Sequence, residues 1–344
     1  MHRVKISDID HVDIQEWNEL LMRSEICDAF QTYEWAQALR NSLGVQPYFL
    51  IVYDGERPIG GVMYLKKKVV GILGAYEVRG GPLYSGTSRS RIMKSILKTL
   101  GEKRSRSAYT LFVPYPIANL SFAETFRKDG FHSITFRTLI VDLDRPISDV
   151  WKALDKDARR GVRKAKKLGV EATVANTARE WKEYYDLHMV HAQEKHYPPE
   201  PQSFYEEMFK LQRKNMCQLF VSKLEDRIIA GTLCLVYREN LVGIRSASSD
   251  AFRKYQPNNL AHWKSIEWAQ ENGVKVYDFD GLPLEQTTYL RGVYNYKKRW
   301  DGTIHWYYYY LNNRILPPAV HLVRTSFLAS KVFSTLRSRR AIPT

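Results

Sequence analysis

The segment VYDFDG occupies residues 276–281 and is followed closely by YNYKKRWDG at residues 294–302. Alternate residues of a β-strand point to the same face, so Asp278 and Asp280 fall on one side of a strand whose other positions are apolar. An isolated Asp-x-Asp-Gly sequence most often does no more than cap a turn. The basic, aromatic segment that follows, which we interpret as a loop, instead favours a functional site at the end of this strand.

The region before this strand has the pattern of an antiparallel meander followed by a helix. Strands are predicted at residues 218–224, 227–237 and 241–247, with a turn at Glu225-Asp226 between the first two. A helix is predicted at about residues 258–271, and Gly273 ends it before the strand at 274–279. These elements predict one compact unit of sheet and helix.

The same order of elements occurs in the first half of the chain. Its predicted strands lie at residues 47–53, 59–66 and 69–76, followed by a helix at about 90–103 and a strand at 108–113. A chain of 344 residues also exceeds one average domain. We therefore predict an α+β protein of two tandem domains, each a mixed, mostly antiparallel sheet flanked by helices.

The predicted boundaries divide the chain into four parts. Residues 1–145 form the first domain, 146–170 a basic inter-domain helix, 171–312 the second domain, and 313–344 a basic amphipathic tail. In the tail, residues 314–340 contain six Lys or Arg residues and no acid, interleaved with apolar residues. Such a segment either lies on an anionic membrane surface or packs on its own domain, and both interpretations stay open.

The composition is that of a globular protein with an unusual charge. The formal net charge is +15, which favours polyanionic partners such as RNA, nucleotide phosphates or an anionic membrane surface. The cysteines Cys27, Cys217 and Cys234 lack metal-ligand spacing, so we expect reduced thiols. No apolar run approaches the roughly 18 to 20 residues of a membrane span, and no secretory signal is evident. We therefore expect a cytoplasmic protein.

The most basic segment is residues 151–170, where eight Lys or Arg residues accompany two Asp residues. At helical spacing most of these cations fall along one face. The guanidinium groups of Arg160 and Arg163 can each bind a phosphate through two hydrogen bonds, and Lys164 adds a further cation. The alternative is a solvated helix face, but such faces normally mix both signs of charge. We interpret this face as a phosphate-binding surface.

Several local motifs occur in a fixed order along the chain. They are RGGP at residues 79–82, ARRGVRKAKKLGV at 158–170, SASSD at 246–250 with YQPN at 255–258, and the two segments quoted first. The repeated meander, helix and strand resembles the acyltransferase fold of the GNAT superfamily. Two copies with these motifs resemble the Fem family of peptidoglycan aminoacyltransferases, over roughly residues 25–310. The chain lacks the long charged helical hairpin of the longer Fem members, so it is most similar to the simpler type.

The resemblance implies a peptide-bond-forming aminoacyltransferase. Its donor would be aminoacyl-tRNA, its acceptor an amine of a lipid- or nucleotide-linked muropeptide, and it would use no metal or other cofactor. The pair Tyr296-Lys297 matches the aromatic-lysine pattern of the family, which makes Lys297 the expected cation near the developing oxyanion or the tRNA end. A lipid-linked acceptor would also suit peripheral association with the membrane. The transferred amino acid, the acceptor and the oligomeric state stay open.

Other site residues are expected from the chemistry of moving an aminoacyl ester onto an amine. The attacking amine must be neutral and must lose a proton, so Asp278 and Asp280 are candidates to orient or deprotonate it. Substrate-assisted proton transfer is the alternative. Further substrate-binding candidates lie in the motifs: Tyr255, Tyr296, and the cations Lys298 and Arg299, which could contact backbone phosphates.

Two rival functions stay open beside this one. An acyl-CoA-dependent N-acyltransferase acting on an amino sugar or surface polysaccharide precursor needs a glycine-rich turn to hold the pyrophosphate. The corresponding segment AFRKYQPNN, residues 251–259, has no glycine, and its proline lacks an N–H donor. The second rival is a non-catalytic RNA- or membrane-binding protein.

Histidine and aromatic clusters elsewhere are weaker signals. A helical His-x-x-His such as His188 and His191 can bind a metal, but His196 is not a third ligand at suitable spacing. We expect partly exposed histidines near the substrate and no metal. The loop YPPEP, residues 197–201, is expected to rim a cleft. Along WYYYY, residues 306–310, strand alternation should send half of the rings into the core.

Overall fold

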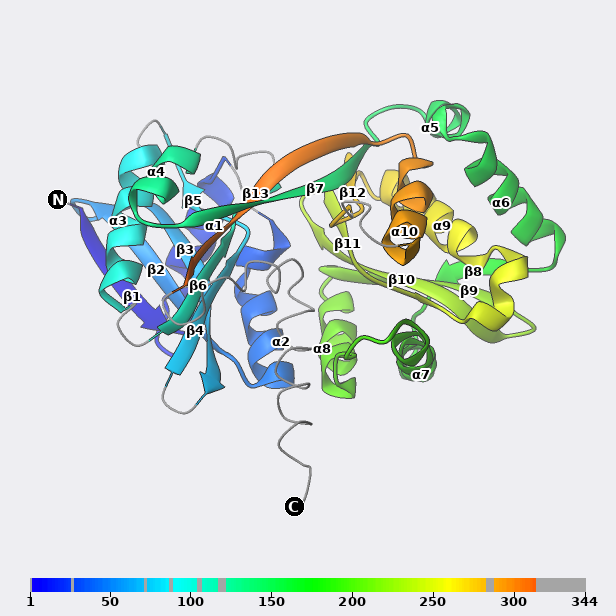
Figure 1. The fold of residues 1–344 in the computed structure, drawn as a ribbon, viewed down its shortest axis with the longest axis horizontal. Helices are drawn as coiled ribbons and strands as arrows, with labels where there is room; N and C mark the ends of the chain where they lie inside the picture. Colours follow the sequence, from blue (N-terminus) through cyan, green and yellow to red (C-terminus); the bar gives the residue numbers. More distant parts are fainter. Residues whose placement is uncertain are drawn as a thin grey trace, which may run out of the picture.

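The computed structural model of the chain describes residues 2–25, 28–70, 73–86, 89–103, 107–116, 122–282 and 288–313. Figure 1 shows two lobes, each with strands covered by helices, and two long strands, β7 (His132–Asp142) and β13 (Thr303–Asn313), that run from one lobe to the other. The predicted tail lies outside the described residues, except for its first residue, Asn313, which ends β13.

The first half of the chain builds one lobe. In chain order its elements are β1 (Arg3–Asp8), α1 (Ile14–Arg23), the 3-10 turn η1 (Ala29–Gln31), α2 (Tyr33–Leu43), β2 (Gln46–Asp54), β3 (Arg57–Val70), β4 (Leu73–Arg79), β5 (Leu83–Tyr84), α3 (Arg89–Lys103), β6 (Ser107–Val113), α4 (Ala123–Lys128) and β7.

The second half builds the other lobe. Its elements are α5 (Ile147–Ala153), α6 (Lys156–Lys167), β8 (Glu171–Val174), α7 (Ala178–Lys195), α8 (Gln202–Gln212), β9 (Cys217–Leu224), β10 (Arg227–Tyr237), β11 (Asn240–Ser248), the 3-10 turn η4 (Asp250–Tyr255), α9 (Pro257–Glu271), β12 (Val276–Asp278), α10 (Thr288–Lys298) and β13.

The described strands form one continuous 13-stranded sheet. Its order is β1-β2-β3-β4-β6-β13-β7-β12-β11-β10-β9-β8, with β5 paired to β3. The runs β1 to β4 and β8 to β11 are antiparallel, whereas β4 pairs parallel with β6 and β11 pairs parallel with β12. The two halves therefore repeat one arrangement, which confirms the predicted α+β fold of two tandem units.

The last strand of each half pairs with the other half. β7 pairs antiparallel with β12, with Ile140 opposite Asp278, and β13 pairs antiparallel with β6, with Tyr310 opposite Phe112. β13 also pairs with β7 along most of its length, from Thr303 to Leu311. The residue boundaries at 145 and 170 stay a prediction, but this exchange means that each lobe is completed by a strand from the other.

The hydrophobic core also joins the two lobes. One buried cluster includes Trp35 from α2 and Phe204 from α8, whose rings meet edge to face at 6.4 Å. The same two helices are linked by polar contacts: Asn41 Nδ2 donates to Glu207 at 3.1 Å, and Ser203 Oγ donates to the Ser42 carbonyl at 3.1 Å. The lobes are thus held in one orientation by packing as well as by the sheet.

Local sequence explains where the helices of the second lobe lie. Gly273, with φ +72°, ends α9 before β12, as predicted. The predicted single basic helix is instead two helices, because Asp155 starts α6 by accepting a hydrogen bond from Asp157 N at 2.7 Å. Gly161 lets α6 approach α9 closely: a Cβ at this position would lie 2.0 Å from Asn259 Nδ2.

The segment after the Asp-x-Asp motif is not a loop as predicted. Residues 294–298 lie in α10, and Trp300 just beyond it is fully buried. The helix forms because Tyr296 and Trp300 pack against the ring of His262 from α9, with ring centroids 5.8 and 5.6 Å away. Cys217 and Cys234 are buried free thiols, and Cys27 lies outside the described residues. No described helix has the length and apolar character needed to cross a membrane.

Candidate active site

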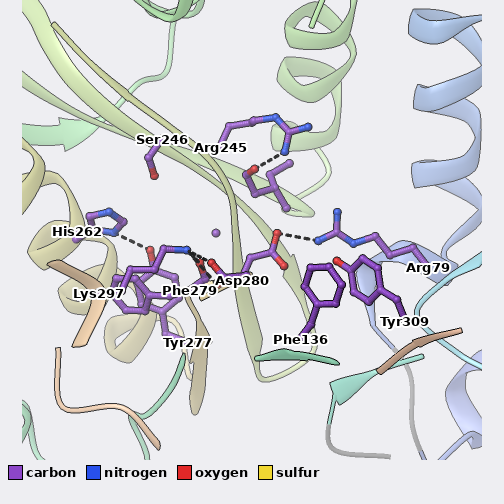
Figure 2. A pocket seen from close by; sticks show the side chains of 13 residues that line it. Arg79, Phe136, Arg245, Ser246, His262, Tyr277, Phe279, Asp280, Lys297 and Tyr309 are labelled. Atoms are coloured by element: carbon purple, nitrogen blue, oxygen red, sulfur yellow. Dashed lines mark hydrogen bonds and ion pairs between the residues drawn. The ribbon is translucent and has the colours of Figure 1, made fainter. Parts of the chain in front are cut away.

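A pocket of about 280 Å³ opens where two parallel strands separate. β11 and β12 are paired from Asn240 opposite Val276 to Val242 opposite Asp278. Beyond that point β11 continues to Ser248, whereas β12 ends at Asp278 and the chain after it turns away from β11. The residues that line the pocket are Arg79, Phe136, Gly243, Ile244, Arg245, Ser246, His262, Tyr277, Phe279, Asp280, Gly281, Lys297 and Tyr309. Figure 2 shows that they come from both lobes.

Lys297 of α10 forms hydrogen bonds with the segment that follows β12. Its ammonium group donates to the carbonyl oxygens of Phe279, Asp280 and Gly281 at 2.6, 3.0 and 2.9 Å (Figure 2). An ammonium group has three N–H donors, so all are engaged here. Burial lowers the pKa of Lys297, and the charges of Asp280 and Asp278 oppose that shift. In this arrangement Lys297 fixes the segment 279–281 and places a positive charge at the pocket wall.

Asp280 joins the two lobes through an ion pair with Arg79. Arg79 Nη2 lies 2.9 Å from Asp280 Oδ2, and the Arg79 guanidinium also stacks on the ring of Phe30 at 3.8 Å. Asp280 has a φ of +53°, a conformation that places its carboxylate past the strand end. Burial alone would raise the pKa of Asp280, but Arg79 and Lys297 hold it below its ordinary value. Asp280 is therefore ionised near neutral pH.

Asp278 is more deeply buried and has a different environment. Its Oδ1 accepts hydrogen bonds from the Asp280 backbone N–H at 2.8 Å and from the Thr138 hydroxyl of β7. Burial, together with the charge of Asp280, raises the pKa of Asp278 to about 6. Unlike Asp280, it can therefore gain or lose a proton near neutral pH.

His262 is a pocket residue that the sequence interpretation missed. It lies on α9, its Nδ1 is 2.9 Å from the hydroxyl of Tyr277, and its ring stacks on Phe279 at 5.0 Å. Burial and the nearby Lys297 lower the pKa of His262 to about 3, so the imidazole is neutral. The sequence offers little signal for it, because a single histidine in a largely buried helix usually serves the core.

Arg245 of β11 is held by a second buried network. Its Nε donates to Glu200 Oε1 at 2.6 Å, and Glu200 Oε2 lies 3.3 Å from His188 Nε2. Burial opposes ionisation of Glu200, yet His188 and Arg245 lower its pKa to about 2. The YPPEP loop was predicted to rim a cleft, but none of its residues lines this pocket. Its Glu200 instead holds Arg245 of the pocket wall from behind.

The prediction of partly exposed histidines is wrong for His188. Its side chain is completely buried, because it faces inward from α7 toward Glu200 and the rings of Tyr205 and Tyr197. His191 is half-buried, with Nδ1 2.8 Å from the Ser248 carbonyl, and His196 ends α7 in a left-handed conformation.

The predicted phosphate-binding residues lie outside the pocket. Arg160, Arg163 and Lys164 are exposed on the face of α6 opposite α9. Arg160 pairs with Asp157 at 3.1 Å, and the Arg163 guanidinium lies 5.4 Å from the ring of Trp151. The cations of α6 thus lie on an exposed face, separate from the residues that line the pocket, and the binding of phosphate by this face stays a prediction.

The remaining candidates connect that surface to the pocket or support its wall. Arg299 pairs with Asp157 of α6 at 3.6 Å, and its carbonyl accepts from Asp155 N at 3.0 Å. Lys298, one residue after the pocket lysine, is exposed. The Tyr296 hydroxyl is buried and packs behind His262, so this residue supports the wall. Tyr255 packs on Phe252 at the start of α9.

Comparison with known proteins places this geometry in a known fold. Residues 152–298 match the acetyltransferase (GNAT) domain family. The structure of FemX superposes with a TM-score of 0.71 at 14% sequence identity, covering 92% of this chain and 99% of the FemX chain. The chain has the tandem GNAT-like fold of FemX. The resemblance to the Fem family is thereby confirmed at the level of the fold.

Two other solved structures share the FemX fold. L-PGS from Bacillus licheniformis aligns with a TM-score of 0.59 at 14% identity, covering 93% of this chain and 96% of that one. A tandem GNAT protein from the clavulanic acid biosynthesis pathway aligns with a TM-score of 0.54 at 10% identity, covering 90% and 98%. A search of curated protein sequences finds no match. In the FemX-like arrangement, the pocket lies between the separated parallel strands of the second unit.

Proposed function

We propose that this protein is an aminoacyltransferase that joins an amino acid from aminoacyl-tRNA to an amine of a peptidoglycan precursor, a lipid- or nucleotide-linked muropeptide. The acyltransferase fold and the pocket at the separation of β11 and β12 support acyl transfer at this position. The proposed reaction needs no metal or further cofactor, since the amine attacks an already activated ester.

The observation that carries the proposal is the basic surface that leads to the pocket. α6 presents its cations to solvent, and Arg299 binds the start of α6 through Asp157 and Asp155. Arg299 and Lys298 directly follow Lys297, which lines the pocket. A tRNA backbone lying along α6 and α10 would therefore deliver its aminoacyl end to the pocket, because phosphates are held by closely spaced Lys and Arg side chains.

The start of α9 supports a donor other than a coenzyme A thioester. In this segment Gln256 adopts φ +56°, and Pro257 occupies the first turn of the helix. Proline has no backbone N–H, and the preceding residues 250–255 form the 3-10 turn η4 with no glycine. The backbone donors that would hold a pyrophosphate at a helix N-terminus are thus reduced in number.

Inside the pocket, the side chains suit attack by an amine on an ester. The charge of the ionised Asp280 attracts an ammonium group to this part of the pocket, and the positive charge of Lys297 stabilises negative charge on the carbonyl oxygen. The neutral His262 beside Lys297 offers a polar imidazole without adding charge. A peripheral position at the membrane would suit a lipid-linked acceptor.

The deciding experiment supplies purified protein with a mixed pool of charged tRNAs and, separately, acyl-CoA thioesters, together with muropeptide and amino-sugar acceptors. Mass spectrometry then follows each acceptor. We expect a mass gain of one amino acid that disappears when the tRNA pool is first treated with RNase. A gain obtained with thioesters alone would replace the proposal with an acyl-CoA-dependent N-acyltransferase, and no gain with either donor would favour a binding protein.

A further inference from the structure

A second, smaller hollow lies next to the pocket, between the two lobes. Its volume is about 30 Å³, which is enough for one small group such as a water molecule or an ammonium group. It shares Arg79, Asp280 and Tyr309 with the pocket. Its other lining residues are Asp28, Phe30, Gly80, Val113, Pro114, Tyr115, Pro116, Val242, Asp278 and Tyr307. We call this hollow the amine chamber.

Asp28 contributes a buried carboxyl group to the amine chamber. It precedes η1, is 2% exposed, and its Oδ1 accepts a hydrogen bond from Phe30 N at 2.9 Å. Among the described residues, its Oδ2 has no hydrogen-bond partner. Gly80 makes room for this group, since a Cβ there would lie 2.3 Å from Oδ1. The first lobe thus places an open carboxyl oxygen at the chamber.

Asp278 contributes a similar group from the second lobe. It is 5% exposed, and both of its hydrogen bonds, from Asp280 N and from Thr138, go to Oδ1. In the described part of the chain, nothing donates a hydrogen bond to its Oδ2. Two carboxyl groups, one from each lobe, therefore reach the same small space with one unused oxygen each.

The chamber is lined by three carboxyl groups, those of Asp28, Asp278 and Asp280, against the single cation Arg79 among its lining residues. Arg79 pairs with Asp280 at 2.9 Å, and the ammonium group of Lys297 is bound to three carbonyl oxygens. Neither Asp28 nor Asp278 forms an ion pair with any described residue. A buried carboxylate is stable when it is paired with a cation or when it takes up a proton. The chamber is therefore built for a small cationic group that also donates hydrogen bonds.

We propose that the amine chamber binds the primary ammonium group of the acceptor, with Asp28 and Asp278 as its two carboxylate ligands. This inference rests on the proposed function for the identity of the acceptor, and it adds which two carboxyl groups hold the acceptor amine. A primary ammonium group has three N–H donors, two of which are satisfied by the open oxygens. The chamber shares Arg79, Asp280 and Tyr309 with the pocket, so the rest of the acceptor extends from the chamber toward the pocket.

The chemistry of these carboxyls suits the proton transfer that the reaction needs. Burial raises the pKa of Asp28 to about 7, with the charge of Asp278 contributing, and burial raises that of Asp278 to about 6. One carboxylate takes a proton from the ammonium group, and the freed nitrogen lone pair forms a C–N bond to the ester carbonyl carbon. As the ester C–O bond breaks, the second proton of the nitrogen passes to the departing ribose oxygen, and the carboxyl proton returns to solvent.

Binding of a minimal probe tests the chamber without any assumption about the donor. We would titrate ¹⁵N-labelled protein with methylammonium, and separately with tetramethylammonium and Mg²⁺, while following the Gly80 and Phe30 amide signals. We expect saturable shifts with methylammonium alone. Asp28→Asn and Asp278→Asn should each weaken its binding at least about tenfold, as expected for loss of one charged hydrogen bond. Asp13→Asn removes a carboxylate that caps α1 in the same way at an exposed site, and it should bind like the wild type.

Three results would overturn the inference: unchanged methylammonium binding in both chamber variants that remain folded, equal binding of tetramethylammonium, or preferential binding of Mg²⁺. Because two variants on different lobes are compared, loss of folding in one leaves the other decisive. In the transfer assay, Asp28→Asn should raise KM for the amine acceptor at least about tenfold without changing KM for the charged tRNA. If the wild type transfers no amino acid at all, the proposed function fails while the methylammonium result still decides the chamber.

Discussion

Arg79 Nη2 lies 2.9 Å from Asp280 Oδ2, although the two residues are 201 positions apart in the chain. Arg79 ends β4, which pairs in parallel with β6 in the first lobe. Asp280 follows β12, which pairs in parallel with β11 in the second lobe. The pair also forms a wall shared by the pocket and the amine chamber. It therefore connects the structural junction of the lobes with the site.

The coupling between Arg79 and Asp280 should be measurable in stability. Both side chains are partly shielded from water, so a double-mutant cycle with Arg79→Ala and Asp280→Ala should give a coupling of about 1 kcal/mol in urea unfolding. The pair Arg3 and Glu56 is far more exposed and should give less than about 0.5 kcal/mol in the same cycle. Equal coupling for the two pairs would contradict a structural role for Arg79 and Asp280.

Replacing Lys297 should affect the reaction more than it affects donor binding. In Lys297→Met the carbonyl groups of residues 279–281 lose their common donor, and the pocket loses a positive charge. We expect the single-turnover transfer rate to fall by about 100-fold or more. The neighbouring Lys298→Met variant, which changes an exposed cation, should mainly raise KM for charged tRNA. A Lys297→Met enzyme with a wild-type rate would show that Lys297 has a structural role alone, in holding residues 279–281.

Removal of the α6 cations should weaken tRNA binding without changing the chemical step. In the triple variant with Arg160, Arg163 and Lys164 changed to Gln, we expect the slope of log K against log salt to fall by about 0.7 to 0.9 for each phosphate that the variant no longer binds. Filter binding over a range of salt concentrations measures this slope. Arg91, Lys94 and Lys98 on the exposed face of α3 provide a matched triple control. If both triples weaken binding equally, the effect is one of net charge alone.

Asp28 should make the stability of the protein depend on pH in an unusual direction. Burial raises its pKa in the folded state to about 7, above the ordinary value of 3.8. Between these values the folded state binds more protons than the unfolded state, so this group's contribution to stability is lost as pH rises. Asp28→Asn should therefore be more stable than the wild type at pH 8, by at most about 4 kcal/mol, and should lose that advantage near pH 4.

Urea unfolding of the wild type and Asp28→Asn at several pH values checks this prediction, with Asp13→Asn as the exposed control. A difference that does not change between pH 4 and pH 8 would mean that Asp28 keeps an ordinary pKa in the folded protein. The same measurement with methylammonium present should reduce the advantage of Asp28→Asn, because a bound cation stabilises the ionised carboxyl of the wild type.

Most of the secondary structure could be predicted from the sequence, because its signals are local. The meander strands alternate or are continuously apolar, and Gly273 and the turn at Glu225-Asp226 supply the positive φ values that their positions require. Where the local signal was ambiguous, the prediction failed. The segment 294–298 is rich in tyrosine and lysine, and its sequence predicts a loop. It is part of a helix because Tyr296 and Trp300 pack on His262.

The site was predicted in part. Asp278 ends a recognisable strand, Asp280 and Lys297 follow it, and all three line the pocket or the chamber. Asp28, Arg79 and His262 were missed as site residues, since each lies in a segment whose local pattern says nothing about a partner. Asp28 precedes a short turn, and His262 occupies a helix that is buried on most sides.

The sequence by itself determined the repeated order of meander, helix and strand, and with it the α+β class and the position of the acidic strand end, because hydrophobic periodicity and turn residues act over a few positions. Only the tertiary structure decided that β7 and β13 are exchanged between the lobes, and that Asp28 and Asp278 face one space. These arrangements bring together residues up to 250 positions apart, and they depend on how the two halves of the sheet are joined and packed, which no local pattern encodes.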